Sequence, residues 1–112
     1  MKKEIRVRCW IDLDGEKFFG PGRAELLELI QESGSIAQAA RQMGMSYKKA
    51  WVMVDEMNTR GRKPFVVTQK GGQQGGYAEV TETGRKVVAA YQKMNKQVQA
   101  VVDKNKDLLK LL

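Results

Sequence analysis

The stretch that decides the fold is residues 34–58, which read GSIAQAARQMGMSYKKAWVMVDEMN. Ser35 is a favourable N-cap for a short helix over residues 36–43, where apolar side chains recur at helical spacing. A three-residue turn begins with glycine and ends with Ser46, a second N-cap, which leads into a longer helix over residues 47–58. Two helices joined in this way predict a helix-turn-helix.

The segment before this stretch predicts a β-hairpin and one more helix. Residues 5–13 alternate between apolar and polar side chains, which is typical of a strand with one buried face. Asp14-Gly15 is a favoured dipeptide in a type I′ turn. We therefore expect a hairpin over residues 5–19, followed by an amphipathic helix over residues 23–32.

The segment after the helix-turn-helix predicts a second hairpin. Strand-forming residues at 65–68 and 77–80 enclose a stretch rich in glycine and glutamine. Three helices followed by a two-stranded hairpin are the order of a winged helix-turn-helix, in which the hairpin is the wing. Thr81 then opens a long helix that we expect to continue to Leu112.

We therefore expect an α+β, mainly α fold: a winged helix-turn-helix with an N-terminal β-hairpin and a long C-terminal dimerisation helix. The DNA-binding domain would span residues 1–80. It would include the hairpin at 5–19, the helix-turn-helix at 35–58 and the wing at 65–80. The dimerisation helix would span residues 81–112.

Composition excludes several classes of function. The 112 residues include 20 Lys and Arg against 13 Asp and Glu, a formal net charge of +7, with no His and one Cys. A His-based triad, a His-ligated metal and a Cys-rich zinc site are therefore impossible, and we expect no enzyme activity, metal or cofactor. Because the chain lacks the apolar region of a signal peptide and any run that could span a bilayer, we expect a cytoplasmic location and no membrane partner.

The positive charge predicts an anionic partner, and double-stranded DNA fits the helix order. The second helix of a helix-turn-helix enters the major groove with its first residues at base edges. Lysines can donate to guanine there, while hydroxyl groups and wing residues can meet phosphates. The candidate DNA-binding residues are Ser35, Ser46, Tyr47, Lys48, Lys49, Arg60, Arg62, Lys63, Lys70, Gln73 and Gln74. The alternatives are a solvated surface position for any one of them and a wing tip that touches nothing.

Two aromatic residues, Tyr47 and Trp51, lie four positions apart in the same predicted helix. We expect Trp51 to lie in the core, whereas Tyr47 fits the core and the DNA surface equally well.

The terminal helix carries an apolar stripe whose spacing alternates between four and three residues, which is typical of a coiled coil. The predicted dimerisation residues are Val87, Tyr91, Met94, Val98, Val101, Asn105, Leu108 and Leu112. A polar residue such as Asn105 can fix the register of such a seam. A helix of about 30 residues would be about 45 Å long, more than so small a domain can cover. We therefore expect a homodimer, and the alternative is a helix folded wholly onto its own domain.

Several motifs together resemble one known family. They are Gly-Ser-Ile-x-x-Ala-Ala at 34–40, Ser-Tyr-Lys-x-Ala-Trp at 46–51, Gly-Gly-x-x-Gly-Gly at 71–76 and Val-Thr-x-x-Gly at 80–84. This combination closely resembles the N-terminal DNA-binding domain of ModE-type molybdate-responsive regulators, which is similar to the LysR-type winged helix-turn-helix. The resemblance covers roughly residues 5–95.

The resemblance implies a dimeric transcription factor that contacts DNA through Ser46, Tyr47, Lys48 and Lys49, with support from the wing. It also implies dimerisation through the terminal helix, with help from the first helix. The full-length family carries molybdate-binding domains after this region, where the present chain stops, so we expect no molybdate site in it. The expected function is a sequence-specific, homodimeric, ModE-like transcriptional regulator without sensor domains. The alternative is a protein-interaction module on a winged-helix scaffold with a coiled-coil tail.

Overall fold

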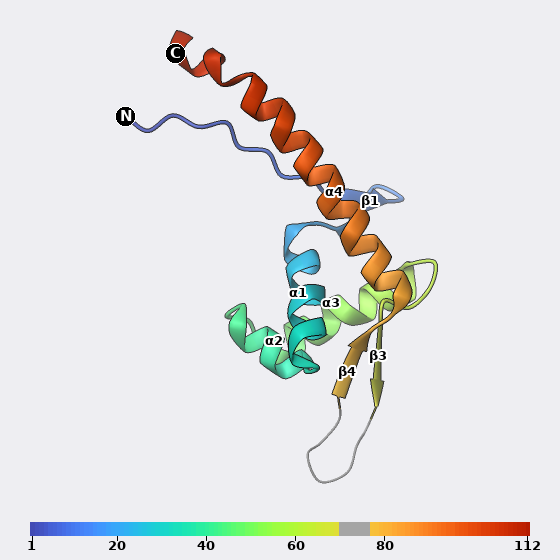
Figure 1. Cartoon of the computed structure of the whole chain (residues 1–112). Helices are drawn as coiled ribbons and strands as arrows, with labels where there is room; N and C mark the ends of the chain where they lie inside the picture. Colours follow the sequence, from blue (N-terminus) through green and yellow to red (C-terminus); the bar gives the residue numbers. More distant parts are fainter. Residues whose placement is uncertain (70–76) are drawn as a thin grey trace.

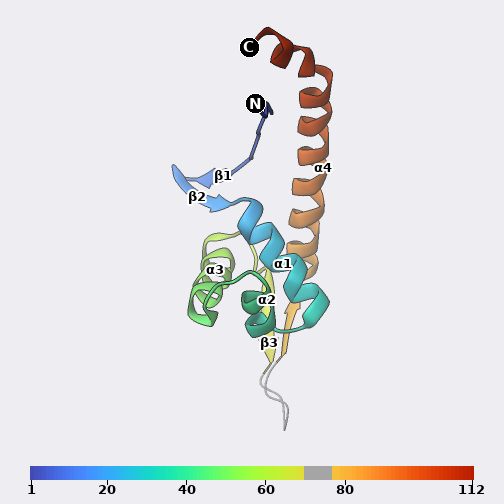
Figure 2. The same cartoon turned by 90° about the vertical axis from the view of Figure 1, so that its left-hand side faces the viewer.

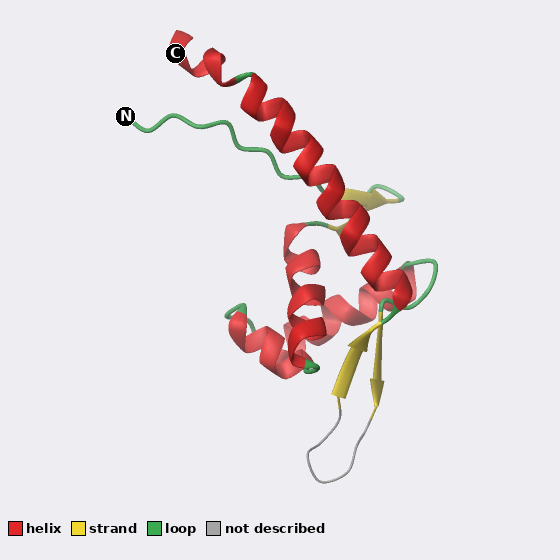
Figure 3. Cartoon of the chain, viewed as in Figure 1, coloured by secondary structure: helices red, strands yellow, loops and turns green. Residues whose placement is uncertain are grey.

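The computed structural model describes residues 1–69 and 77–112 of the chain. In these residues, two small hairpins flank a three-helix body, and a long helix follows the second hairpin (Figures 1 and 3). The elements are, in chain order, β1 (Ile11–Leu13), β2 (Glu16–Phe19), α1 (Pro21–Ser33), α2 (Ile36–Gln42), α3 (Tyr47–Arg60), β3 (Val66–Gln69), β4 (Tyr77–Val80), α4 (Glu82–Lys104) and the 3₁₀ helix η1 (Lys106–Leu111). This order confirms the predicted mixed, mainly α, winged-helix fold.

Two serines and a glycine set the geometry of the helix-turn-helix. The hydroxyl oxygens of Ser35 and Ser46 accept hydrogen bonds from the backbone N–H groups of Gln38 and Lys49, at 3.1 and 3.0 Å. They therefore cap α2 and α3, as predicted. Gly44 adopts a φ of 69°, a left-handed conformation that glycine reaches without steric cost. The chain can thus leave α2 and enter α3 within three residues.

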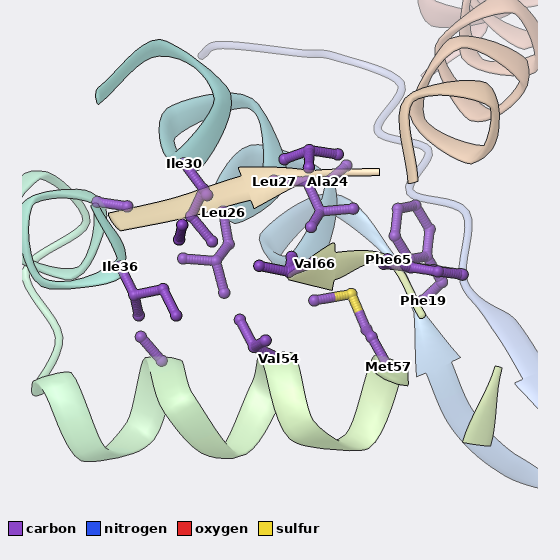
Figure 4. Packing of buried hydrophobic residues seen from close by; sticks show 14 of the residues in the cluster. Phe19, Ala24, Leu26, Leu27, Ile30, Ile36, Val54, Met57, Phe65 and Val66 are labelled. Carbon is purple, nitrogen blue, oxygen red and sulfur yellow. The ribbon is translucent and has the colours of Figure 1, made fainter. Parts of the chain in front are cut away.

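The core lies between the three helices and the wing strands. Val54 and Met57 point from α3 toward the α1 side chain of Leu26 and toward Val66 of β3 (Figure 4). In α2, the small side chains of Ala39 and Ala40 are fully buried, which allows α1 and α3 each to pack closely against α2. Burial of one face of α3 leaves its opposite face open to solvent.

The base of α4 is packed directly onto the wing. Gly84 lies in the first turn of α4, and a Cβ atom there would lie 2.6 Å from the carbonyl oxygen of Phe65 and 2.7 Å from Val80. One turn further, Val87 packs against the core, and the ring of Tyr91 meets Phe19 edge-on at 5.2 Å. The proximal part of α4 therefore belongs to the same core as the three helices and the wing strands, which together form the winged body.

The N-terminal hairpin is shorter than the sequence predicts. Asp14 and Gly15 have φ values of 51° and 80°, which confirms the predicted turn. However, β1 includes only Ile11–Leu13, so the prediction of a strand over residues 5–10 is wrong. The partner strand β2 has four residues before the chain turns into α1, so the earlier residues have no strand to pair with.

The residues before β1 lie instead on the side of α4. The hydroxyl of Tyr91 donates a hydrogen bond to the carbonyl oxygen of Cys9 at 2.7 Å, and the ammonium of Lys3 donates to the carbonyl oxygen of Leu112. In Figures 1 and 2 the N-terminal segment runs antiparallel to α4, and the two termini lie at the same end of the molecule. Tyr91, a predicted dimerisation residue, is thus buried within its own chain.

The long helix also ends earlier than predicted. The α-helix stops at Lys104, and Asn105, with φ −114° and ψ 17°, separates it from η1. The side chain of Asn105, the C-cap residue, donates to the carbonyl oxygen of Val101 at 2.8 Å. The prediction of one helix to Leu112 is therefore wrong in its last eight residues.

The wing strands and α4 extend in opposite directions from the body (Figure 2). The molecule is accordingly elongated, with extents of 60 × 31 × 22 Å. Within residues 1–69 and 77–112, none of the helices combines the length and the apolar character that a membrane crossing requires.

Candidate nucleic-acid interface

Helix α3 presents a basic, exposed first turn. Its buried stripe consists of Ala50, Val54 and Met57, which fixes the rotation of the helix about its axis. Lys48 and Lys49 lie outside this stripe and are exposed. In the described part of the chain, neither ammonium group takes part in a hydrogen bond or an ion pair, so both are available to an anionic partner.

The two capping serines are engaged with the backbone. Ser46 is exposed at the start of α3, next to Lys48 and Lys49, and Ser35 is half-buried at the start of α2. Each hydroxyl oxygen accepts a backbone hydrogen bond, but its own proton remains free to be donated. Both predicted site residues can therefore cap a helix and contact a phosphate at the same time.

Trp51 does not lie in the core, and that prediction is wrong. Its side chain is 43% exposed, because the buried face is centred on Ala50 and Val54 and places Trp51 at the edge of the stripe. Tyr47 is exposed as well, so of the two positions that its spacing allowed, the core is excluded.

Tyr47 and Trp51 line a groove between the helix-turn-helix and the wing. The groove has a volume of about 410 Å³, and its other walls include Ser35 and Ala37 of the α2 end and Thr68 and Tyr77 of the wing strands. The predicted site residues Ser35 and Tyr47 are therefore brought together with two aromatic residues, Trp51 and Tyr77, that the predicted site lacked. Tyr77 opens the strand at 77–80, but nothing in the strand pattern indicated that its ring would face α3.

The opposite end of α3 is tied to the wing base. The Oδ1 atom of Asn58 accepts hydrogen bonds from the backbone N–H groups of Phe65 and Val66, at 2.8 and 3.1 Å. Its Nδ2 atom donates to the carbonyl oxygen of Val66 at 2.8 Å. Asn58 therefore sets the position of β3 relative to α3, and with it the position of the wing relative to Lys48.

Arg60 is engaged with the N-terminal hairpin. Its guanidinium group donates to the carbonyl oxygens of Lys17 and Leu13, at 3.1 and 3.2 Å, and lies 5.5 Å from the ring centroid of Phe18. Twelve residues separate it from Lys48, a rise of about 18 Å along α3. The structure thus does not bring Arg60 together with the basic first turn.

The remaining predicted wing residues divide into two groups. Arg62 and Lys63 are exposed in the connection between α3 and β3, at the base of the wing. Lys70, Gln73 and Gln74 lie outside the described residues. The described part of the chain also contains no group of three or more His, Cys, Asp or Glu side chains that could hold a metal ion.

The predicted dimerisation residues change character along α4. Val87, Met94 and Val98 are half-buried against their own chain. Further along, Val101 is 60% exposed and Leu108 is 52% exposed, and Leu112 is exposed as well. Among the predicted dimerisation residues, those that are exposed therefore lie in the distal part of α4 and in η1, beyond the three helices and the wing.

Comparison with solved structures defines the class of fold. The DNA-binding domain of CbnR, solved in a complex with DNA, matches this chain with a TM-score of 0.57 at 13% identity. The match covers 78% of this chain and 94% of that domain. The fold is thus that of the winged helix-turn-helix domains found in DNA-binding proteins.

Comparison of sequences narrows this class to one family. The molybdenum transport protein ModE of Azotobacter vinelandii is 38% identical over 98 residues, 88% of this chain and 36% of the relative. The DNA-binding transcriptional dual regulator ModE of Escherichia coli K12 is 35% identical over 88 residues, 79% of this chain and 34% of the relative. Over most of its length, the chain is therefore a homologue of the ModE-type regulators. It spans about a third of the length of these curated relatives. No protein-family model matches the chain.

Proposed function

We propose that this chain is the DNA-reading part of a transcriptional regulator and that it binds double-stranded DNA in a sequence-specific manner. The observation that carries the proposal is the first turn of α3. Its capped end presents two exposed lysines outside the buried stripe of Ala50, Val54 and Met57, with Lys48 opposite the stripe and Lys49 beside it. A helix held in this way can enter the major groove with its charged residues leading.

In this proposal the contacts divide by chemistry. Lys48 and Lys49 meet base edges or the nearest phosphates, and the hydroxyl protons of Ser35, Ser46 and Tyr47 are donated to phosphates. The wing, with Arg62 and Lys63 at its base, lies over the neighbouring part of the duplex. Arg60 contributes by holding the N-terminal hairpin in place, because its donors already meet backbone carbonyls. Residues 1–80 are then the reading domain.

We also propose that residues 81–112 join two copies of the chain. Val101 and Leu108 support this, because a monomer leaves them largely in water, beyond the part of α4 that the winged body covers. A two-fold dimer would place two α3 helices on one face of a duplex, with half-sites about 34 Å or a multiple apart. The response of the whole regulator to an effector would depend on parts of the relatives that this chain does not span.

Selection of bound sequences from random duplexes tests the proposal. A palindromic motif is the expected result. With a selected duplex, Lys48→Ala combined with Lys49→Ala should weaken binding at least tenfold while the melting temperature changes by no more than about 2 °C. The logarithm of the affinity should fall linearly with the logarithm of salt concentration, and more shallowly in this variant.

The matched control removes the same charge elsewhere. Lys93→Ala combined with Lys96→Ala takes two exposed lysines from α4 and should leave the affinity within about twofold of the parent. Equal binding by the α3 double variant and the parent would refute the role of α3. Failure to select any duplex would refute DNA binding itself.

The dimer has its own test. Leu108→Lys should shift the chain from dimer to monomer in analytical ultracentrifugation, because it places a charge on the exposed apolar surface that the proposed dimer would bury. Gln97→Lys, at an exposed position outside the stripe, is the control. A parent chain that sediments as a monomer at tens of micromolar would refute the dimer.

A further inference from the structure

An apolar pair lies beside the basic first turn of α3. Trp51 is 43% exposed and Val52 is 46% exposed, three and four residues after Lys48. Residues at these spacings are neighbours on one face of a helix. Single exposed apolar residues are common, but these two are both neighbours of Lys48 and continue the surface that it begins.

Nothing in the described part of the chain covers this pair. The ring of Trp51 forms one wall of the groove toward the wing, and the groove is open beside it. Val52 lies opposite the buried stripe of α3. The surface available to a partner is thus cationic in the first turn and apolar in the second.

The next exposed residue along this face has the opposite charge. Asp55 follows Val52 by three residues, and its carboxylate is exposed. An unpaired carboxylate is repelled by DNA phosphates and by the acceptor atoms of guanine. The part of α3 that can face a duplex therefore ends with the apolar pair.

We propose that Trp51 and Val52 make this chain a reader of thymine, through van der Waals contact with the C5 methyl group in the major groove. This proposal rests on the proposed function and adds the base that α3 prefers. The thymine methyl is the apolar group that an unmodified duplex presents in its major groove. One helical turn rises about 5.4 Å, and base pairs are stacked about 3.4 Å apart. The preferred thymine therefore lies one or two base pairs from the base that Lys48 contacts.

Replacement of thymine by deoxyuridine tests this directly, because it removes the methyl group and changes nothing else on the base. Each thymine of a selected duplex is replaced in turn, and affinity is measured by fluorescence anisotropy. We expect one or two positions in each half-site at which the loss of the methyl weakens binding about three- to fivefold. All other positions should be indifferent.

Protein variants then assign the effect to the pair. Val52→Ala and Trp51→Ala should bind more weakly and should no longer distinguish thymine from deoxyuridine at those positions. Both residues are exposed, and the two variants are separate, so the assignment does not depend on either one alone. Val67→Ala, which truncates a valine with 44% exposure on β3, is the matched control and should retain the parental discrimination.

The possible outcomes distinguish failure of this proposal from failure of the proposed function on which it rests. A chain that selects a duplex but tolerates deoxyuridine at every position refutes the reading of thymine and leaves the proposed function intact. Discrimination that persists in both α3 variants also refutes it. A chain that selects no duplex refutes the proposed function, and the reading of thymine falls with it.

Discussion

The two ends of α3 both carry positive charge, and the structure uses them in different ways. At the first end, Lys48 and Lys49 are exposed, and in the described residues their ammonium groups have no polar partner. At the other end, Arg60 donates to two carbonyl oxygens of the N-terminal hairpin, and Asn58 makes three hydrogen bonds with the wing base. One end is a free surface and the other is an anchor.

The difference shows what decides the role of a basic residue in so small a domain. The guanidinium of Arg60 reaches two backbone carbonyl groups of the N-terminal hairpin, and its planar donors can bond to both at once. The ammonium group of Lys48 makes no such bond within residues 1–69 and 77–112. Substitutions at the anchoring end should therefore lower stability, and substitutions at the free end should lower affinity for DNA.

The largest expected effect is at Asn58. Asn58→Leu leaves the backbone N–H groups of Phe65 and Val66 without their acceptor, and we expect the free energy of unfolding to fall by about 3 kcal/mol. Urea denaturation followed by circular dichroism measures the change. Asn58→Asp keeps the acceptor and should lose less than Asn58→Leu. An unfolding free energy within 1 kcal/mol of the parent for Asn58→Leu would show that water replaces the side chain.

Arg60 tests whether the anchor and the free surface are separable. Arg60→Met keeps much of the packing on Phe18 but removes both hydrogen bonds to the hairpin, so we expect a loss of about 1–2 kcal/mol in unfolding free energy. The affinity for a selected duplex should change less than twofold. Arg62 is a neighbouring exposed arginine, and Arg62→Met should lower the affinity for the duplex while leaving the free energy of unfolding nearly unchanged. A large loss of affinity in Arg60→Met would show that this end of α3 also meets DNA.

Ser46 separates the two properties at the free end. Ser46→Ala removes the cap of α3 and should cost about 1 kcal/mol of stability. Ser46→Asp restores a capping oxygen but places a carboxylate where phosphates approach, so stability should recover while affinity for DNA falls. Equal affinity in Ser46→Asp and the parent would place the DNA elsewhere.

The smallest expected effect concerns the end of α4, where the charges are exposed. A hydrogen bond from Gln99, and then one from Lys106, hold the pKa of Asp103 below its usual range. A carboxyl whose pKa is lowered by folding adds stability above its unfolded-state pKa of about 3.9, and this stability is lost as the pH falls. Gln99→Ala should therefore raise the NMR titration midpoint of Asp103 toward the ordinary value. An unchanged midpoint would show that this hydrogen bond is absent in solution.

The order of elements could be predicted because local signals mark most of the boundaries. The capping serines, the glycines at 34 and 44 and the Asp-Gly turn each have a backbone requirement that the sequence states directly. The prediction of a strand over residues 5–10 was wrong because an alternating pattern shows only that a strand there could have one buried face. It does not show that a partner strand exists. The end of the long helix was placed too late because asparagine occurs both as a polar seam residue and at helix ends, and the spacing around Asn105 does not distinguish the two.

The candidate site was predictable where it depends on one helix and unpredictable where it depends on packing. The place of Lys48 and Lys49 in the first turn of α3 could be predicted, because Ser46 marks where that helix begins. In α3, the pairs Tyr47–Trp51 and Ala50–Val54 have the same spacing, and only the packing of α3 against α2 and the rest of the core decides that the second pair is buried. The engagement of Arg60 with carbonyls some 45 residues earlier in the chain leaves no trace in the local sequence.

The glycine at the base of α4 has a mechanical consequence. Because Gly84 has no side chain, the backbone of α4 lies directly against Phe65 and Val80 at the base of the wing. The 23 residues of α4 then form a lever about 35 Å long whose fulcrum lies on the wing base. A displacement of about 3 Å at its far end corresponds to a tilt of roughly 5° at the fulcrum for a rod of that length. Because Val87 and Tyr91 also fix this helix to the core, whatever holds the far end of α4 sets the angle at which the wing and α3 are presented together.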